Sequence, residues 1–300
     1  MVIRGAFSAL LRPGLRKDFR DSYNSYPEEY SKFLKVGTQD KAEIEAVTVV
    51  GLPRMVNVGE AEATPHVDPI QGTMYRYTDL IYKLGFMVSQ EMMEDDLYHK
   101  AAQHAKWLGK SVRMTQEYRA AALLDDAFAG GTFTGDNGEA LCISTHTNYG
   151  TASTGSNVLA TATQLSVTGL QSMWDVAGAT TDQRGFPMPV MIDLIVCDIA
   201  DEWVAIQLTK NSDEPYTANR NINALRTKRA SLTYMVSHYK TQNRDWFGFD
   251  HQLQDAHFKF RVKPQFTDGD DDDTGAAYFR ARQRLNVFFH DWRGVLGTNP

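Results

Sequence analysis

The chain is poor in cysteine and lacks the short motifs that mark many enzymes and metal proteins. Its 300 residues include two cysteines, Cys142 and Cys197, and neither belongs to a Cys-x-x-Cys pair or to a Cys/His group with ligand spacing. No His-Glu-x-x-His or Gly-x-Ser-x-Gly sequence is present. We therefore expect two buried, reduced thiols, which suits folding in a cytosol. We assign no catalytic, cofactor-binding or metal-binding residue.

The sequence also lacks long apolar runs and an excess of positive charge. The apolar stretch from Ala6 to Leu11 is broken by Arg12 and Pro13, so it is too short for a signal sequence or a membrane span. The formal net charge is -6. A chain with this balance repels phosphates more than it attracts them. A membrane protein and a general nucleic-acid binder are therefore both disfavoured.

Two patterns come near a phosphate or metal site, and both fail. Gly109-Lys110-Ser111 resembles the end of a phosphate-binding loop, but His104 stands where that loop needs a glycine, and the segment lies in a predicted helix. The acidic run Asp268–Asp273 matches the first half of a calcium loop, but Ala281 stands where the bidentate acid belongs. We interpret the run as a solvated turn between two strands, and whether it binds an ion stays open.

The clearest element is a helix predicted from Ser89 to Phe128. Ser89 is a favourable N-cap, acidic residues follow in the first turns, and Gly130 and Gly131 end the helix. At about 1.5 Å per residue, its length would be about 60 Å. Gly109 is expected to permit a bend. Apolar residues recur at helical spacing along one face only: Met93, Leu97, Ala101, Ala105, Leu108 and Val112.

A two-stranded excursion is predicted before this helix. Ala46–Val50, Arg54–Val58, Thr73–Tyr77 and Leu80–Val88 are strand-like, whereas Gly59–Gly72 has few large apolar residues. An isolated ribbon cannot bury a core of its own, so it needs a partner surface. Residues 1–40 are rich in charge and tyrosine, and the first twenty are basic. We interpret them as a solvated, partly helical arm, with an extended arm that docks on a neighbour as the alternative.

A linker over residues 131–158 and a mixed domain are predicted after the long helix. Helices and strands are segregated rather than alternating, so the predicted fold class is α+β. In the last strand, arginines alternate with apolar residues. The expected elements are a helix over Leu170–Ala177, a strand over Val190–Cys197, a helix that Asp198 caps and that carries Trp203 and Leu208, a polar loop over 211–223, and strands over Tyr234–Ser237, Trp246–Phe249, Phe258–Val262 and Tyr278–Phe289.

The order of these parts resembles that of the tailed-bacteriophage major capsid proteins with the Hong Kong phage-type fold. Three segments carry the local similarity. Lys83–Asp96 is similar to the junction between the E-loop and the spine helix of phage head subunits. Tyr239–Phe249, with its Trp246-Phe247 pair, resembles the strand pair of the A-domain. Asp291-Trp292-Arg293-Gly294-Val295 resembles a recurrent C-terminal end of such subunits.

The resemblance implies a structural subunit of an icosahedral capsid, with no enzyme activity. It divides the chain into an N-terminal arm (1–46), an E-loop (47–88), a P-domain with the spine helix (89–140), an A-domain (141–257) and a return to the P-domain strands (258–300). The subunit would form pentamers and hexamers around a dsDNA genome. Two alternatives remain: a portal or tail component, and a metal-dependent hydrolase that uses Asp268–Asp273.

The implied location is the virion, after assembly in the cytoplasm of the host bacterium. The implied partners are other copies of the chain, a portal protein and packaged dsDNA contacted without sequence selectivity, with a separate scaffolding protein and a decoration protein as further candidates and no membrane. Fewer than fifty residues precede the ribbon, so we expect scaffolding to be a separate protein or unnecessary. Some relatives cross-link an E-loop lysine to a neighbour, but residues 47–82 contain no lysine. We therefore expect a shell without covalent links.

Overall fold

The computed structural model describes residues 5–89, 91–92, 98–135, 138–210, 232–241, 244–271 and 276–300. The chain divides into two compact units, and each unit is built from three separate stretches of sequence. Unit 1 holds the described parts of Met1–Glu43, Thr78–Ala120 and Phe258–Val287. Unit 2 holds those of Ile44–Tyr77, Ala121–His257 and Phe288–Pro300.

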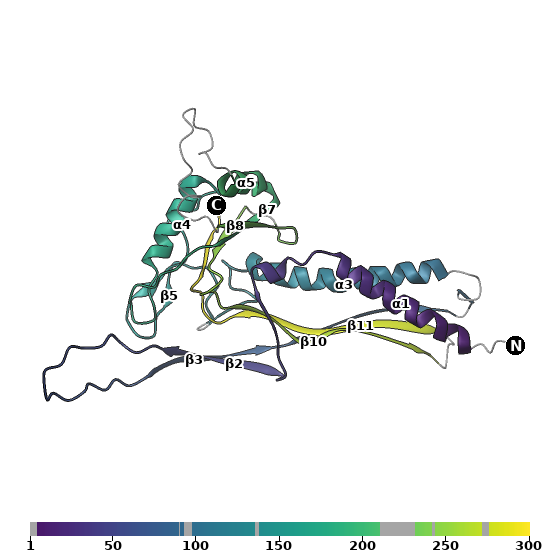
Figure 1. Ribbon diagram of the computed structural model, residues 1–300, viewed down its shortest axis with the longest axis horizontal. Helices are drawn as coiled ribbons and strands as arrows, with labels where there is room; N and C mark the ends of the chain where they lie inside the picture. The colour runs from purple at the N-terminus through teal and green to yellow at the C-terminus, as the bar shows by residue number, and fades with distance from the viewer. Residues whose placement is uncertain are drawn as a thin grey trace, which may run out of the picture. The chain divides into compact units, whose positions relative to one another are not determined.

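Unit 1 is a four-stranded sheet with two helices on one of its faces (Figure 1). The strand order is β1-β10-β11-β4, and β11 pairs antiparallel with β4 from Ala277 opposite Val88 to Leu285 opposite Leu80. The elements are α1 (Gly5–Ser25), the short helix η1 (Tyr30–Lys32), β1 (Lys35–Thr38), β4 (Leu80–Val88), α3 (Tyr98–Asp125), β10 (Ala256–Asp270) and β11 (Ala277–Phe289).

The core of unit 1 follows from two periodicities. On β11, Phe279 and Ala281 are buried, whereas Arg280 and Arg282 between them are exposed, as period-two alternation predicts. On α3, the predicted apolar stripe is confirmed for the described residues Ala101, Ala105, Leu108 and Val112, which are all buried. The stripe packs on the apolar face of β11. Met93 and Leu97 lie outside the described residues.

The structure describes the long helix as α3, Tyr98–Asp125, within the predicted Ser89–Phe128. The Ser89 hydroxyl accepts a hydrogen bond of 3.3 Å from the Met92 N–H, which is the bond of an N-cap to the helical residues 91 and 92. That Ser89 begins the long helix itself stays a prediction. Residues 93–97 lie outside the described part, and α3 then runs without a break from Tyr98 to Asp125. Helix α3 ends at Asp125, and turns over residues 126–129 lead to Gly130, which has a left-handed φ of +63°. Gly109 serves close packing rather than the expected bend, because a Cβ there would lie 2.5 Å from the Phe19 carbonyl oxygen.

The N-terminal segment is helical where the structure describes it. Helix α1 contains Pro13 in its interior. Leu15 and Phe19 are buried and pack with residues of α3 and β11. The Arg113 guanidinium lies over the Tyr23 ring at 4.2 Å. The predicted helical character is confirmed for Gly5–Ser25, so the alternative of an extended arm is wrong there. The expectation of a solvated arm is wrong at Leu15 and Phe19, because these apolar residues are buried within unit 1.

Unit 2 is built around a second four-stranded sheet, ordered β12-β9-β7-β8. Strands β7 and β8 are parallel, whereas β9 pairs antiparallel with β7 and with β12. Leu170 and Met173 of α4 pack with Ile195 and Trp246 in the core. The elements are β5 (His146–Thr147), β6 (Thr154–Gly155), α4 (Val167–Ala179), β7 (Leu194–Asp198), η3 (Ile199–Asp201), α5 (Glu202–Lys210), β8 (Thr233–Ser237), β9 (Trp246–Phe249) and β12 (Val295–Thr298).

Most of the predicted elements of this region are confirmed. Asp198 caps the helical segment after β7 by accepting the Ile199 N–H at 2.5 Å. Both cysteines, Cys142 and Cys197, are buried free thiols, as expected. The predicted loop over 211–223 lies outside the described residues. None of the described helices combines the length and the apolar character that a membrane crossing requires.

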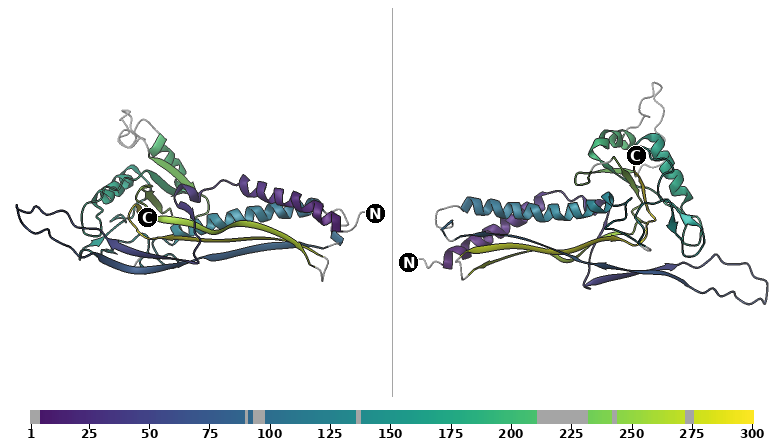
Figure 2. Two further views of the ribbon diagram at one scale, coloured as in Figure 1. Left: turned by 60° about the horizontal axis from the view of Figure 1, so that its bottom comes forward. Right: turned by 180° about the vertical axis from the view of Figure 1, so that it is seen from behind.

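The predicted excursion is a ribbon of β2 (Glu43–Val50) and β3 (Ile70–Thr78), and we call the chain between them, residues 51–69, the tip (Figure 2). The predicted strand over Arg54–Val58 is wrong. Its β-branched residues lie in the tip, where the chain forms no strand. The strand predicted over Leu80–Val88 is confirmed as β4, but it pairs with β11 in the sheet of unit 1 rather than with the ribbon.

Candidate functional site

The ribbon carries an unusual set of exposed apolar side chains. Every residue from 54 to 69 is exposed, and the side chains of Leu52 and Met55 are left 73% and 101% exposed. Soluble monomers rarely expose large apolar patches unless the patch binds something. The set comprises Val47, Val49, Leu52, Met55, Val56, Val58, Val67 and Met74.

The strands of the ribbon are anchored within unit 2, and so is the start of its tip, where Arg184 donates to the Gly51 carbonyl and Arg54 lies over the Phe186 ring at 5.4 Å. The Tyr149 hydroxyl donates a hydrogen bond of 3.1 Å to the Thr73 hydroxyl. Tyr77 is buried and its ring stacks on Phe288, with centroids 4.5 Å apart. Strand β3 therefore belongs to the core of unit 2, and the exposed apolar side chains extend from a fixed base.

A second apolar surface lies on the edge of the unit 1 sheet. Strand β4 is the last strand of that sheet, and Leu80, Ile81, Leu84 and Met87 on it are exposed. An edge strand offers unpaired backbone groups to another chain unless something covers it. The edge is thus a second candidate for contact with another subunit.

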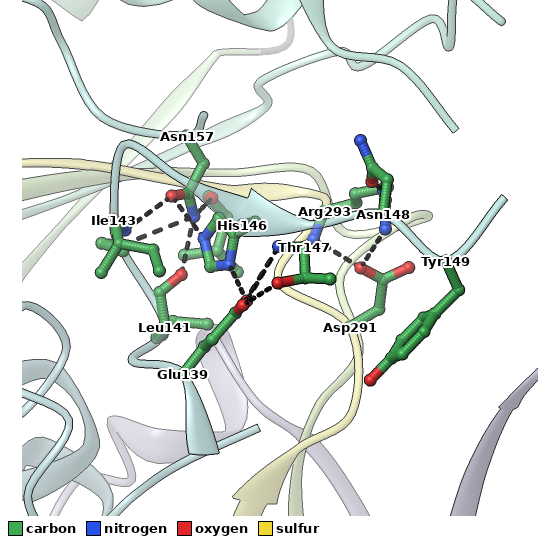
Figure 3. A network of polar contacts seen from close by, with 12 residues as sticks. Glu139, Leu141, Ile143, His146, Thr147, Asn148, Tyr149, Asn157, Asp291 and Arg293 are labelled. Atoms are coloured by element: carbon green, nitrogen blue, oxygen red, sulfur yellow. Dashed lines mark hydrogen bonds and ion pairs between the residues drawn. The ribbon is translucent and has the colours of Figure 1, made fainter. Parts of the chain in front are cut away.

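A buried polar network in unit 2 is the arrangement most similar to an active site (Figure 3). The Glu139 carboxylate accepts the Thr147 N–H at 3.1 Å and the Thr147 hydroxyl at 2.6 Å. It also contacts Nδ1 of His146 at 3.1 Å, and Nε2 of His146 contacts Asn157 Oδ1 at 3.0 Å. Burial lowers the pKa of His146, although its contacts with Asn157 and Glu139 act in the opposite direction.

Asn157 closes the network on the backbone. Its side-chain amide donates to the carbonyls of Leu141 and Val295 at 2.7 and 2.8 Å. Its Oδ1 accepts the Ile143 N–H at 3.0 Å. The His146 ring is buried and stacked on Trp292, 4.2 Å between centroids. The His146 ring and Glu139 also line a pocket. Their hydrogen bonds join separate chain segments, so we interpret the network as a structural link.

The closing motif noted in the sequence is structural for the same reason. The buried Arg293 guanidinium donates to the Thr181 carbonyl at 2.7 Å, to Asn148 Oδ1 at 2.5 Å and to Asp291 Oδ1 at 3.0 Å. Gly294 has φ +88°, and a Cβ there would lie 2.5 Å from a backbone nitrogen. This motif therefore needs these residue types for packing, and sequence reasoning did not identify its partners.

Sequence reasoning also missed a buried carboxylate in unit 1. Glu117 on α3 accepts the backbone N–H groups of Glu29 and Tyr30, both at 3.1 Å. Burial raises the pKa of Glu117 from 4.5 to about 7, although both hydrogen bonds favour the ionised form. The group ties the chain after α1 to the long helix, and its polar contacts are to the backbone.

The acidic run is placed only in part. Asp268 and Asp270 lie at the end of β10, and Asp271 donates its N–H to the Ala276 carbonyl at 2.8 Å, which closes the predicted turn. Asp272 and Asp273 lie outside the described residues. The Asp268 side chain is 2% exposed and pairs with Arg16 at 2.5 Å, so this carboxylate is not solvated as expected. Ion binding by Asp268–Asp273 stays an open prediction.

The chain is similar to known capsid proteins along most of its length. The family model described as "Phage capsid protein" matches residues 81–297. The procapsid structure of bacteriophage JBD30 is 14% identical, with a TM-score of 0.53 over 98% of this chain and 75% of that one. The capsid structure of cyanophage P-SCSP1u is 12% identical, with a TM-score of 0.57 over 89% and 86%. No curated protein sequence matches the chain.

The chain is also similar to the subunit of a virus-like particle. The virus-like particle from Pyrococcus furiosus is 8% identical, with a TM-score of 0.54 over 95% of this chain and 97% of that one. At such low sequence identity, the similarity to these structures shows the fold alone. They confirm the predicted α+β fold with its long helix, ribbon and mixed domain.

Proposed function

Because this chain belongs to the phage capsid protein family, we propose that its ribbon is the clasp by which one subunit holds the next. The protein is a structural subunit of a virus capsid, located in the virion, and is not an enzyme. It assembles with copies of itself. The proposal goes further and assigns the tip, residues 51–69, to the contact between copies in closed shells of pentamers and hexamers.

The exposed apolar set of the ribbon is the observation that supports this proposal. Burying one Val, Leu or Met side chain contributes about 1.5–3 kcal/mol. The set has eight members, so covering it would contribute on the order of 10 kcal/mol before the entropy lost on association is subtracted. In a ring, each subunit gives one ribbon and receives one, and symmetry multiplies the contact.

We further propose how the two units correspond to the expected domains. Unit 1 would hold the N-terminal arm up to Glu43, the last part of the expected E-loop (78–88) and the P-domain up to Ala120. Unit 2 would hold the rest of the E-loop (47–77), the end of the P-domain (121–140) and the A-domain (141–257). Residues 288–300 group with unit 2, because β12 pairs with β9. The P-domain return proposed for 258–300 would then keep only its first part, 258–287, in unit 1.

The remaining partners follow from the same family membership. We propose that the subunit assembles in the cytoplasm of the host bacterium around a portal protein, with a separate scaffolding protein and a decoration protein as further candidates. Packaged dsDNA would be contacted without base readout, because the chain's formal net charge is -6 and readout needs clustered donors aimed at a groove.

Replacing residues 54–69 by a short Gly/Ser turn tests the clasp. Strands β2 and β3 are kept, because Tyr77 belongs to the core of unit 2. We expect a soluble subunit with the circular-dichroism spectrum of the wild type that no longer closes shells in electron micrographs. A matched control, Asn57→Ser with Glu60→Ser, changes the tip but leaves its apolar side chains and should assemble normally.

A sharper version removes only the apolar contacts. Leu52→Ser, Met55→Ser and Val56→Ser together should weaken assembly as strongly as the deletion does. Normal shells from either variant would contradict the clasp. An unfolded, aggregated deletion variant would contradict it too, because the tip would then belong to the core. Rings or open tubes from the wild type would indicate a portal or tail component instead.

A further inference from the structure

We propose that Asp255, His257 and His290 form a binding site for a divalent transition-metal ion of the zinc type. The three side chains offer a carboxylate oxygen and two imidazole nitrogens. One such atom from each residue lies within 4.8 Å of the other two. All three residues are only partly buried, so an ion can reach them from solvent. None of the three residues belongs to the exposed apolar set of the ribbon or to the hydrogen-bonded network of Glu139, His146 and Asn157, although His290 and His146 line the same pocket.

The backbone brings these residues together. Asp255 directly precedes β10 and His257 is the second residue of that strand, so the two side chains point to the same face. His290 directly follows β11, the neighbouring strand in the sheet. The His290 N–H donates to the Asp255 carbonyl at 3.3 Å. The three ligands therefore lie together where β10 begins and β11 ends, and all three belong to unit 2.

Aromatic rings hold both imidazoles in place. The buried Phe288 ring lies 5.4 Å from the His257 ring and 4.9 Å from the His290 ring, between centroids. Tyr77 meets the His290 ring edge to face at 5.2 Å. Tyr77 is itself fixed, because its hydroxyl donates to the Phe289 carbonyl. Ligands positioned in this way lose little conformational freedom when an ion binds.

The donor set suits Zn²⁺. This ion binds imidazole nitrogen at about 2.0–2.1 Å and carboxylate oxygen at about 2.0–2.2 Å, often with three protein ligands and a water. Tetrahedral bonds of that length place the ligand atoms about 3.3 Å apart. His257 Nε2 and Asp255 Oδ1 already lie 2.6 Å apart, joined by a hydrogen bond that coordination would replace. Ca²⁺ and Mg²⁺ prefer sets made of oxygen alone. The ion would act as a staple between the ends of β10 and β11.

The test uses the whole chain, stripped with EDTA and titrated with ZnCl₂ in a calorimeter. We expect one equivalent of Zn²⁺ to bind and to raise the unfolding temperature. His290→Gln and Asp255→Asn should each weaken binding by more than the roughly 10–100-fold that follows the loss of a second-shell partner. His66→Gln, in the exposed tip, is the matched control and should bind as the wild type does.

Replacing Zn²⁺ with Co²⁺ gives a second readout on the wild type, because a nitrogen- and oxygen-coordinated Co²⁺ has visible d–d bands. Bands of four- or five-coordinate Co²⁺ that titrate to one equivalent support the site. Absence of uptake by the wild type would overturn the proposal, whatever the variants do. Equal uptake by the wild type, His290→Gln and Asp255→Asn would also overturn it, because the ion would then sit on other histidines.

Discussion

The side-chain amide of Asn157 donates a hydrogen bond of 2.8 Å to the backbone carbonyl of Val295, a residue 138 positions further along the chain. The same amide donates to the Leu141 carbonyl at 2.7 Å. One buried side chain thus links the linker after the long helix to the first residue of β12. The stability of unit 2 should therefore depend strongly on this buried side chain.

Asn157→Ala should therefore be among the most destabilising single substitutions in unit 2. It leaves two backbone carbonyls, the Ile143 N–H and the His146 ring without their partner. Each buried polar group left unsatisfied costs about 1–3 kcal/mol, so we expect a loss of at least about 3 kcal/mol in urea unfolding. Asn57→Ala, in the exposed tip, should change the free energy of unfolding little. Equal midpoints for the two variants would contradict the structural role of the network.

Two helical glycines should respond to alanine with opposite signs. A Cβ at Gly109 would lie 2.5 Å from the Phe19 carbonyl oxygen, whereas a Cβ at Gly14 would meet nothing within 4 Å. Overpacking of this kind costs about 1–3 kcal/mol, so Gly109→Ala should lower the unfolding temperature. Gly14→Ala should raise stability by up to about 1 kcal/mol through helix propensity. Thermal unfolding of both variants decides the matter, and stabilisation by Gly109→Ala would show that α1 does not pack tightly on α3.

Glu117 should make the subunit more stable as the pH falls from about 7 towards 4.5. Burial raises the pKa of Glu117 from its ordinary 4.5 to about 7. Over this range the folded state holds a proton that the unfolded chain releases, so stability rises as the pH falls and levels off below 4.5. Glu117→Gln should remove this contribution, measured as the difference between the urea-unfolding profiles of variant and wild type. Glu62→Gln, at an exposed position, should leave the profile unchanged.

The assembled shell should hold together without covalent bonds between subunits. Residues 47–82 contain no lysine that could form an isopeptide bond, and both cysteines are buried thiols. Particles boiled in detergent should run as one band near 33.7 kDa, with or without reductant. A ladder of oligomers in the reduced lane would show a cross-link from a lysine elsewhere in the chain.

Elements with a strong local pattern were predictable. Trp246–Phe249 is confirmed as β9 with the predicted bounds, and Tyr278–Phe289 differs from β11 by one residue at its start. Strand β10 is longer than the predicted Phe258–Val262. The prediction over Arg54–Val58 failed because β-branched residues favour a strand only where a neighbouring strand pairs with them.

The polar network could not be predicted because its partners are far apart in sequence. His146, Asn157 and Arg293 are ordinary polar residues when read one at a time. Their roles depend on which backbone carbonyls the fold brings beside them, and no periodicity contains that information. The group of Asp255, His257 and His290 could not be predicted either, because only the pairing of β10 with β11 brings His290 to the other two residues.

The interleaving of the two units governs when the protein can fold during translation. Unit 1 needs residues up to Val287, and unit 2 needs residues beyond Phe288, although both also contain segments made early. A nascent chain that has just finished the long helix therefore has neither unit complete. The ribbon leaves the ribosome long before the core that anchors it is complete. We therefore expect nascent chains not to bind one another through the ribbon, and assembly to begin only when synthesis of each subunit is nearly finished.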